Sequence, residues 1–326
     1  MANPADIVDI IQTPALIKDD FIRTGRIVLD DNGTPIHYTG GFAIVFPFII
    51  NNEKWAFRCW YNSIGNIGRR LKILSNELDS LNLPYFCKFR YVERGLVLEG
   101  KARPTTRMVW IDGLNIKDYI CQHAYSPEVI RNLAEQFFTM CTDLHMHKIA
   151  HGDLQHGNII VDKSGSIYLI DYDSVFLPAL EGEKDIITGL GAYQHPSRIK
   201  RENIFTNEKL DYFSELVIYL SIIAIAEDPS LVADFNLDKS DNLLFKKEDF
   251  SNLKSSFVYK RLIRLGGDVK LLLSILEEYL NIKSIVDLFP FENVISKTRC
   301  SNYCIICGQP FRKDDEYCIY CGSKRL

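Results

Sequence analysis

One short segment, residues 151–158 with the sequence HGDLQHGN, constrains the fold of this chain more than any other. It holds Asp153 and, five positions later, Asn158, on a loop that contains two glycines. Two short apolar runs follow, joined by a Ser-Gly turn, and they predict a β-hairpin over about 158–170. Asp171 comes directly after the second run, thirteen residues beyond Asn158. The pattern therefore predicts three polar side chains presented by one loop and one hairpin.

These residue types in this order suit phosphoryl transfer. That chemistry needs a group that orients the attacking hydroxyl, and it needs oxygen ligands for Mg²⁺, because the metal neutralises charge on the phosphates. Asp153 and Asn158 on a tight loop, together with Asp171 at the end of the next strand, supply both kinds of group. A polar hairpin with capped turns is the alternative explanation, and the position of Asp171 counts against it.

The segment resembles the catalytic loop and metal-binding motif of the eukaryotic-like protein kinase superfamily, which includes bacterial-type Ser/Thr kinases. Leu144-His145 shortly before it also fits that family's approach to the loop. The resemblance implies that Asp153 is the catalytic base and that Asn158 and Asp171 hold Mg²⁺ or Mn²⁺. It also implies ATP as the phosphoryl donor.

A glycine pair near the N-terminus resembles the glycine-rich loop that covers the phosphates in this superfamily. Gly40-Gly41 is followed by the sequence FAIV, in which Ala43 replaces the third glycine of the family's pattern and Val45 closes the motif. Taken alone this is a weak signal, because a glycine in a strand more often marks a bulge.

Arg58 stands thirteen residues past Val45, where the family has its phosphate-binding lysine. A guanidinium is a planar fork and not a point charge on a flexible stem, so the geometry differs while the charge is kept. Leucines at alternating spacings of three and four predict an amphipathic helix over 66–81, which carries Glu77. Glu77 fits the glutamate that positions the basic residue, and Arg58 could either hold phosphates or block the pocket by pairing with it.

Further motifs follow in the family's order. Residues 108–113 (MVWIDG) resemble the hinge between lobes, whose backbone would bind adenine, and residues 191–196 (GAYQHP) resemble the end of an activation segment. Asp211 resembles the aspartate that buttresses the catalytic loop. The nucleotide-binding positions that the resemblance implies are Gly40, Gly41, Val45, Ala56, Arg58, Met108, Val109, Trp110 and Ile160.

Besides Arg58, three further departures from the family's pattern bear on function. Gly152 stands where regulated kinases often have an arginine, Gln155 replaces a lysine, and Asp173 replaces the glycine after Asp171-Tyr172. The primary interpretation is an ATP-dependent Ser/Thr-type protein kinase that transfers the γ-phosphate to a hydroxyl of a protein substrate or partner. One alternative is a nucleotide-binding pseudokinase scaffold, which Arg58 favours. The other is a small-molecule kinase, which Gln155 suggests and Asp211 argues against.

The expected elements run from a strand-rich part to a helix-rich part, which is an α+β order. The resemblance implies a two-lobed protein-kinase-like fold over residues 1–292. Two strands joined at an Asn-Asn turn are expected within 38–60, and several short strands within 86–111. Helices are expected over 127–147, 211–226 and 268–281. We therefore expect a β-rich N-lobe over about 20–112, a helical C-lobe over about 113–292, a linker at 293–299 and a zinc ribbon at 300–326.

Composition and charge limit the partners and the cellular location that we expect. A net charge of −4 over 326 residues gives no case for bulk electrostatic binding to nucleic acid. The longest apolar run, residues 216–226, is too short to span a bilayer and suits a buried helix, so no membrane partner is expected. The chain opens without a secretory signal, which predicts a cytoplasmic protein. The scattered cysteines at 59, 87, 121 and 141 are expected to be small apolar core residues.

The C-terminal 27 residues form a separate pattern with five cysteines. Two C-x-x-C-G turns, ten residues apart, place four thiolates on two tight turns, which suits tetrahedral Zn²⁺. The predicted zinc ligands are Cys304, Cys307, Cys318 and Cys321, with Cys300 left over. A module this small cannot fold on apolar burial alone, so the metal is expected to be structural.

Overall fold

The structure is a computed structural model that describes residues 3–40, 42–62, 64–185, 189–199, 204–301, 309–312, 317 and 319–320. The chain forms two compact units. Unit 1 comprises Met1–Tyr119 and His156–Ile186, and unit 2 comprises Ile120–Gln155 and Ile187–Leu326. Each unit is described by itself below.

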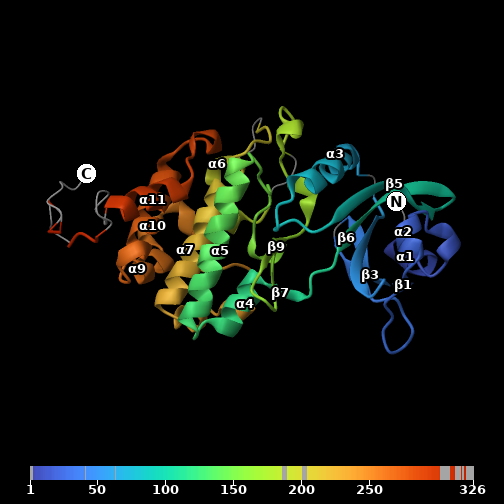
Figure 1. The fold of residues 1–326 in the computed structure, drawn as a ribbon, viewed down its shortest axis with the longest axis horizontal. Coiled ribbons are helices and arrows are strands. Elements are labelled where there is room, and N and C mark those ends of the chain that lie inside the picture. The colour runs from blue at the N-terminus through green and yellow to red at the C-terminus, as the bar shows by residue number, and fades with distance from the viewer. Residues whose placement is uncertain are drawn as a thin grey trace. The chain divides into compact units, whose positions relative to one another are not determined.

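A six-stranded antiparallel sheet forms the centre of unit 1 (Figure 1). Its order is β1-β3-β4-β6-β5, and β2 pairs with β3 off this path. The strands are β1 (Arg26–Ile27), β2 (Tyr38–Thr39), β3 (Ala43–Ile50), β4 (Glu53–Trp60), β5 (Phe89–Leu98) and β6 (Lys101–Val109). A second antiparallel sheet in this unit contains β7 (Gly113–Asn115), β8 (Ile159–Asp162) and β9 (Ile167–Leu169).

Two tight turns define the large sheet. Asn51 and Asn52 both have positive φ, at 50° and 66°, which is the backbone that a two-residue hairpin needs and that asparagine tolerates well. The predicted pair of strands within 38–60 is thereby confirmed. Glu99 and Gly100 make a similar turn, so the several short strands expected within 86–111 are in fact two long ones. The hairpin predicted over 158–170 is also confirmed, as β8 and β9.

One face of the large sheet is covered by the N-terminal segment, in which α1 (Pro4–Ile10) and α2 (Asp20–Arg23) are the helices. Ile7, Ile17 and Ile22 are buried there in one apolar cluster with alternate residues of β3 and β4. Because side chains alternate between the two faces of a strand, the other residues of β3 and β4 face away from this core. The predicted helix over 66–81 is confirmed as α3 (Asn66–Leu81).

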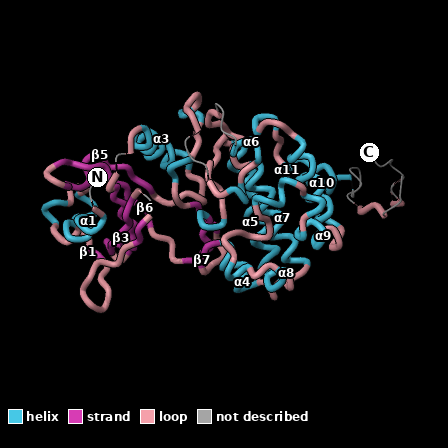
Figure 2. Tube along the Cα trace, turned by 180° about the vertical axis from the view of Figure 1, so that it is seen from behind, coloured by secondary structure: helices cyan, strands magenta, loops and turns pink. Residues whose placement is uncertain are grey.

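Unit 2 is helical. Its helices are α5 (Pro127–Met146), α6 (Pro196–Ile199), α7 (Tyr212–Glu227), α8 (Leu231–Asp234), α9 (Phe257–Leu262), α10 (Gly267–Asn281) and α11 (Phe291–Ser301), while α4 (Ile116–His123) begins in unit 1. Figures 1 and 2 both show α5 and α7 side by side. Fourteen of the sixteen residues of α7 are buried, which confirms the buried helix predicted from its apolar run. Within the described part of the chain, no helix is long and apolar enough to cross a membrane.

The sheet-based unit and the helical unit are together compatible with a kinase-like fold. The scattered cysteines behave as expected, since Cys59, Cys87 and Cys141 are buried and Cys121 is half-buried. Burial raises the pKa of Cys87 to about 11, so its thiol stays protonated at neutral pH.

Candidate functional site

The face of the large sheet opposite the apolar cluster carries most of the predicted nucleotide-binding positions. Val45 on β3 pairs directly with Arg58 on β4, and Ala56 pairs with Met108 on β6. Residues paired across an antiparallel ladder point to the same side, and residues two apart on a strand do so as well. These four side chains therefore share one half-buried surface.

The glycine segment closes one end of this surface. The hydroxyl of Tyr61 donates to the carbonyl oxygen of Gly40, and the Gly40 N–H donates to Ala43 O at 2.9 Å. Phe42, at the tip, is 69% exposed. Gly41 lies outside the described residues, so its predicted role stays a prediction.

The hinge differs from expectation in its backbone. The N–H of Val109 donates to Lys88 O at 3.0 Å and that of Trp110 donates to Lys54 O at 2.9 Å. These two donors are therefore already engaged, and adenine recognition would fall to carbonyl oxygens or to residues after Trp110. The Trp110 ring itself lies against Tyr38, with centroids 5.4 Å apart, and under the ammonium of Lys54 at 4.2 Å.

The hairpin brings the two predicted Mg²⁺ ligands to one end of unit 1's small sheet. Ile159 pairs with Leu169, and the Ile170 N–H donates to Asn158 O at 3.0 Å. Asn158 immediately precedes β8 and is buried, whereas Asp171 follows β9 at the same end and is half-exposed. Ile160, one of the predicted nucleotide-binding positions, is half-buried on β8.

Arg58 binds two carboxylates from the segment after β9. Its Nη1 lies 2.9 Å from Asp173 Oδ1 and its Nη2 lies 2.8 Å from Asp173 Oδ2, a two-pronged pair. Nη1 also donates to Asp171 Oδ1 at 3.0 Å. The site therefore contains one cationic group and two anionic groups in direct contact.

In direct contact, the two carboxylates of this cluster outnumber the one guanidinium that they share. Burial opposes the charge on Arg58, but Asp173 and Asp171 outweigh it and raise the arginine's pKa. Burial raises the pKa of Asp173, with Asp171 adding to the effect and with Arg58 and, more weakly, Arg70 opposing it. Two carboxylates sharing one guanidinium are an arrangement that a further cation would relieve.

Asp171 has an uncommon backbone conformation. Its φ is 63° and its ψ is 74°, in the left-handed region that few residues other than glycine adopt, although aspartate tolerates it better than most. This conformation lies at the start of the 3₁₀ turn Tyr172–Ser174. Strained residues that the surrounding structure holds in place are concentrated at functional sites.

Glu77 is a correction to the sequence analysis. It is exposed on α3, while Arg58 bonds to Asp173 and Asp171, so Glu77 does not supply the expected counter-ion. The buried charged residue of this helix is Arg70, which is 3% exposed. The Arg70 guanidinium lies 3.1 Å from Glu183 Oε2 and donates to Val175 O at 3.3 Å.

Asp153 lies in unit 2, where the backbone just before it is held from two sides. The carboxylate of Asp211 accepts the N–H of His151 and that of Gly152, the latter at 2.9 Å. Arg198, buried in α6, donates to Gly152 O at 2.6 Å and to Gln194 Oε1 at 2.7 Å. Burial raises the pKa of Asp211, against the opposing effects of His151 and Arg198.

Gly189 makes room for Asp153. Its φ is +60°, and a Cβ at this position would lie 2.6 Å from Asp153 Oδ1 and 2.5 Å from Gln194 Nε2. A Cβ would therefore force the side chains of Asp153 and Gln194 to shift, and the positive φ also favours glycine at this position.

Sequence patterns do not point to four residues of this candidate site: Arg70, Asp173, Gly189 and Arg198. Asp173 was noted only as a substitution, although a carboxylate two residues after Asp171 is itself a signal of an added charge partner. The one sequence signal for Gly189 is its place shortly before residues 191–196, the segment that resembles the end of an activation segment. No local pattern distinguishes the buried Arg70 and Arg198 from surface arginines.

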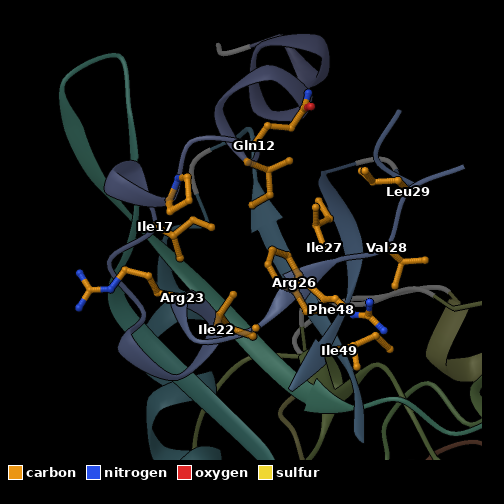
Figure 3. A pocket seen from close by; sticks show the side chains of 13 residues that line it. Gln12, Ile17, Ile22, Arg23, Arg26, Ile27, Val28, Leu29, Phe48 and Ile49 are labelled. Atoms are coloured by element: carbon orange, nitrogen blue, oxygen red, sulfur yellow. The ribbon is translucent and has the colours of Figure 1, made fainter. Parts of the chain in front are cut away.

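A cavity of about 650 Å³ lies elsewhere in unit 1, between the N-terminal segment and strands β1 and β3. Figure 3 shows Ile17, Ile22 and Phe48 on its wall, with Gln12 and Arg26 among the polar residues. Its lining contains none of the predicted nucleotide contacts.

The predicted zinc ligands, Cys304, Cys307, Cys318 and Cys321, fall outside the described residues. Among the residues that the structure does describe, no group of three or more His, Cys, Asp or Glu side chains could hold a metal. Asn158 is not one of these residue types, but the side-chain oxygens of Asn158 and Asp171 are of the kind that Mg²⁺ prefers.

The family model of the ABC1 atypical kinase-like domain matches residues 105–176. This segment is kinase-like. The match begins in β6 and includes the loop with Asp153, the hairpin and the Asp171–Asp173 segment. It supports a kinase-like domain in this chain, with ATP and Mg²⁺ as the ligands such a domain generally uses. At the level of activity it supports a kinase-like phosphotransferase or a pseudokinase.

Proposed function

We propose that this chain binds ATP with Mg²⁺ and transfers the γ-phosphate to a hydroxyl group of a protein, as a Ser/Thr-type kinase. The observation that carries the proposal is the junction of Asn158, Asp171 and Arg58 beside the half-buried face of the large sheet. The match of residues 105–176 to an atypical kinase-like domain supports it independently.

Each residue has a defined task in this proposal. Arg58 binds phosphate oxygens, and Asn158 and Asp171 hold Mg²⁺, which neutralises phosphate charge when bound. Asp171 fits this role because it is half-exposed and its Oδ2 makes no hydrogen bond with any described residue. Asp153 accepts the proton of the attacking hydroxyl, held by the loop that Asp211 and Arg198 fix.

The experiment is transfer of labelled γ-phosphate from ATP by the wild type beside Asp153→Asn, with the protein itself and generic proteins as acceptors. Transfer by the wild type and its loss in the variant support the proposal. Melting curves with ATP and either Mg²⁺ or Mn²⁺ accompany it, because a ligand that binds the native state raises the melting temperature. Transfer to small hydroxyl compounds alone would indicate a small-molecule kinase.

A pseudokinase is the second candidate, and one contact favours it. Arg58 donates to Asp171 Oδ1 at 3.0 Å and thereby engages an oxygen of a proposed metal ligand. A protein that binds ATP but transfers no phosphate to any acceptor or to water would be a pseudokinase. Arg58→Lys separates the two candidates, because a lysine ammonium on its flexible stem frees Asp171 more readily than the arginine guanidinium does. An active kinase should keep some transfer in this variant, whereas a pseudokinase that is blocked by Arg58 should gain transfer that the wild type lacks.

We also propose that residues 300–326 form a zinc ribbon that is held by Cys304, Cys307, Cys318 and Cys321. The support is the spacing of the two C-x-x-C-G turns. Metal analysis of the purified protein should give one zinc per chain, as four thiolates fill a tetrahedral site. Cys307→Ser should lose the metal and Cys300→Ser should keep it, and equal loss from both would show that the ligands are wrongly assigned.

A further inference from the structure

Arg58 has a carboxylate partner whose position in the chain was not expected. Of the two aspartates that contact it, Asp173 is the more buried, with 17% of its side chain exposed against 47% for Asp171. Asp173 also makes two parallel bonds to the guanidinium, whereas Asp171 makes one. Two parallel bonds fix both the position and the plane of an arginine fork.

The two departures at this site explain each other. Arginine replaces lysine at position 58, and an aspartate replaces glycine at position 173. A lysine ammonium cannot match a carboxylate in two-pronged fashion, but a guanidinium can. The counter-ion has thus moved from the helix, where Glu77 is exposed, to the segment that follows β9.

The helix α3 remains connected to this segment through Arg70. Its guanidinium donates to the carbonyl oxygen of Val175, two residues after Asp173, and pairs with Glu183 further along. Arg70 is buried, so the contact is shielded from water. The neighbouring Arg69 also pairs with Glu183, at 3.3 Å, but its side chain is 72% exposed.

We propose that Asp173 is the positioning residue for Arg58 in nucleotide binding, and that α3 supports it through Arg70. This inference rests on the proposed function, because it assigns the group that aims Arg58 at the phosphates. Asp171 is the shared carboxylate and is the one expected to hold Mg²⁺. Asp173 keeps Arg58 aimed when a cation competes with Arg58 for Asp171.

The test measures the affinity of the full-length protein for a fluorescent ATP analogue, with Mg²⁺ and with chelator. The variants are Asp173→Asn, Arg58→Gln and the double variant, with the exposed Asp31→Asn as the control. We expect Asp173→Asn to weaken binding about ten-fold, as a charge-assisted two-pronged pair is lost. The double variant should bind no more weakly than Arg58→Gln, since residues that act through one another are not additive.

A second pair of variants tests the helix. Arg70→Gln should weaken nucleotide binding, as Asp173→Asn does, and Arg69→Gln should leave the affinity within about two-fold, because an exposed ion pair contributes little.

Asp173→Glu keeps the charge and should restore part of the affinity. Melting curves establish which variants are folded, and if Asp173→Asn is not, the neutral Asp173→Ser replaces it with the same expected loss.

The outcomes distinguish a failure of the proposed function from a failure of the role assigned to Asp173. If the wild type binds no nucleotide with either metal, the proposed function fails and the role of Asp173 fails with it. If the wild type binds but the losses from Asp173→Asn and Arg58→Gln add, Asp173 does not act through Arg58 and only the inference is overturned. A loss in Glu77→Gln with none in Asp173→Asn would return the counter-ion to α3.

Discussion

Arg198 and Gly152 are joined by a buried hydrogen bond of 2.6 Å from the guanidinium to the carbonyl oxygen, one residue before Asp153. The N–H of the same glycine donates to Asp211. Both the N–H and the carbonyl oxygen of Gly152, the residue before the predicted catalytic base, are therefore hydrogen-bonded. In the proposed function, Asp211 and Arg198 would therefore position Asp153 through its backbone.

Arg198→Met should destabilise the protein by about 3 kcal/mol, because removing one partner from a buried charged network leaves the others unpaired. Urea unfolding of the two proteins measures the difference. The matched control is Arg131→Met, which removes an exposed pair with Glu227 and should cost less than about 1 kcal/mol. If both substitutions lower the free energy of unfolding equally, the buried bond from Arg198 to Gly152 stabilises the protein no more than an exposed ion pair does.

Local patterns made much of the fold predictable. The leucine spacing located α3 to the residue, and the Asn-Asn and Ser-Gly turns located two hairpins. Such signals lie within a few residues of one another, and backbone geometry alone converts them into structure. Asn158 and Asp171 met for the same reason, because one hairpin connects them.

The partner of Arg58 was not predictable in this way. The family's pattern predicts Glu77, nineteen residues beyond Arg58, but the partner is Asp173, which lies 115 residues away. Which of two carboxylates reaches a guanidinium depends on how the sheet, α3 and the segment after β9 pack. The engaged N–H groups of Val109 and Trp110 escaped prediction similarly, since their acceptors Lys88 and Lys54 lie on other segments.

Gly189→Ala should lower the rate of phosphoryl transfer by more than its small loss in the free energy of unfolding can explain. The added Cβ meets Asp153 Oδ1 and Gln194 Nε2, so Asp153 must move, and the positive φ disfavours alanine by about 1 kcal/mol. Transfer rates and urea unfolding should be measured on the same preparations. Gly182→Ala is the control, because that glycine also has positive φ but a Cβ there meets nothing within 4 Å. Equal effects on transfer would exclude displacement of Asp153 as the cause.

A buried histidine in unit 2 predicts how stability depends on pH. His145 lies between two carboxylates, with Nε2 2.8 Å from Glu215 and Nδ1 bonded to Glu292. Burial disfavours its charge, but Glu215 and Glu292 outweigh burial and raise the pKa of His145 to about 10. Its contribution is therefore complete below its ordinary pKa of 6.5 and is lost as the pH rises to about 10. Burial raises the pKa of Glu215 to about 7, which acts in the same direction at lower pH.

The free energy of unfolding should therefore fall between pH 7 and 10 by on the order of 2 kcal/mol more in the wild type than in His145→Gln. Urea titrations of both proteins across this range measure the difference. His147→Gln serves as the control, since that exposed ring bonds only to the backbone oxygen of Asp143 within the described chain. Parallel pH profiles for the wild type and His145→Gln would contradict the assignment.

The last prediction separates metal binding from proton transfer. Asp171→Asn should abolish phosphoryl transfer and also weaken nucleotide binding in Mg²⁺, because an amide is a poorer ligand than a carboxylate for a hard cation. Asp153→Asn should abolish transfer while leaving the affinity for nucleotide within about two-fold, since its contact matters mainly in the transition state. Adding a chelator should weaken nucleotide binding in the wild type and in Asp153→Asn, and should have little further effect in Asp171→Asn. If chelator acts equally on all three proteins, Asp171 does not hold the metal. Since Arg58 donates to Asp171 at 3.0 Å, that result would leave Asp171 as a partner of the arginine alone.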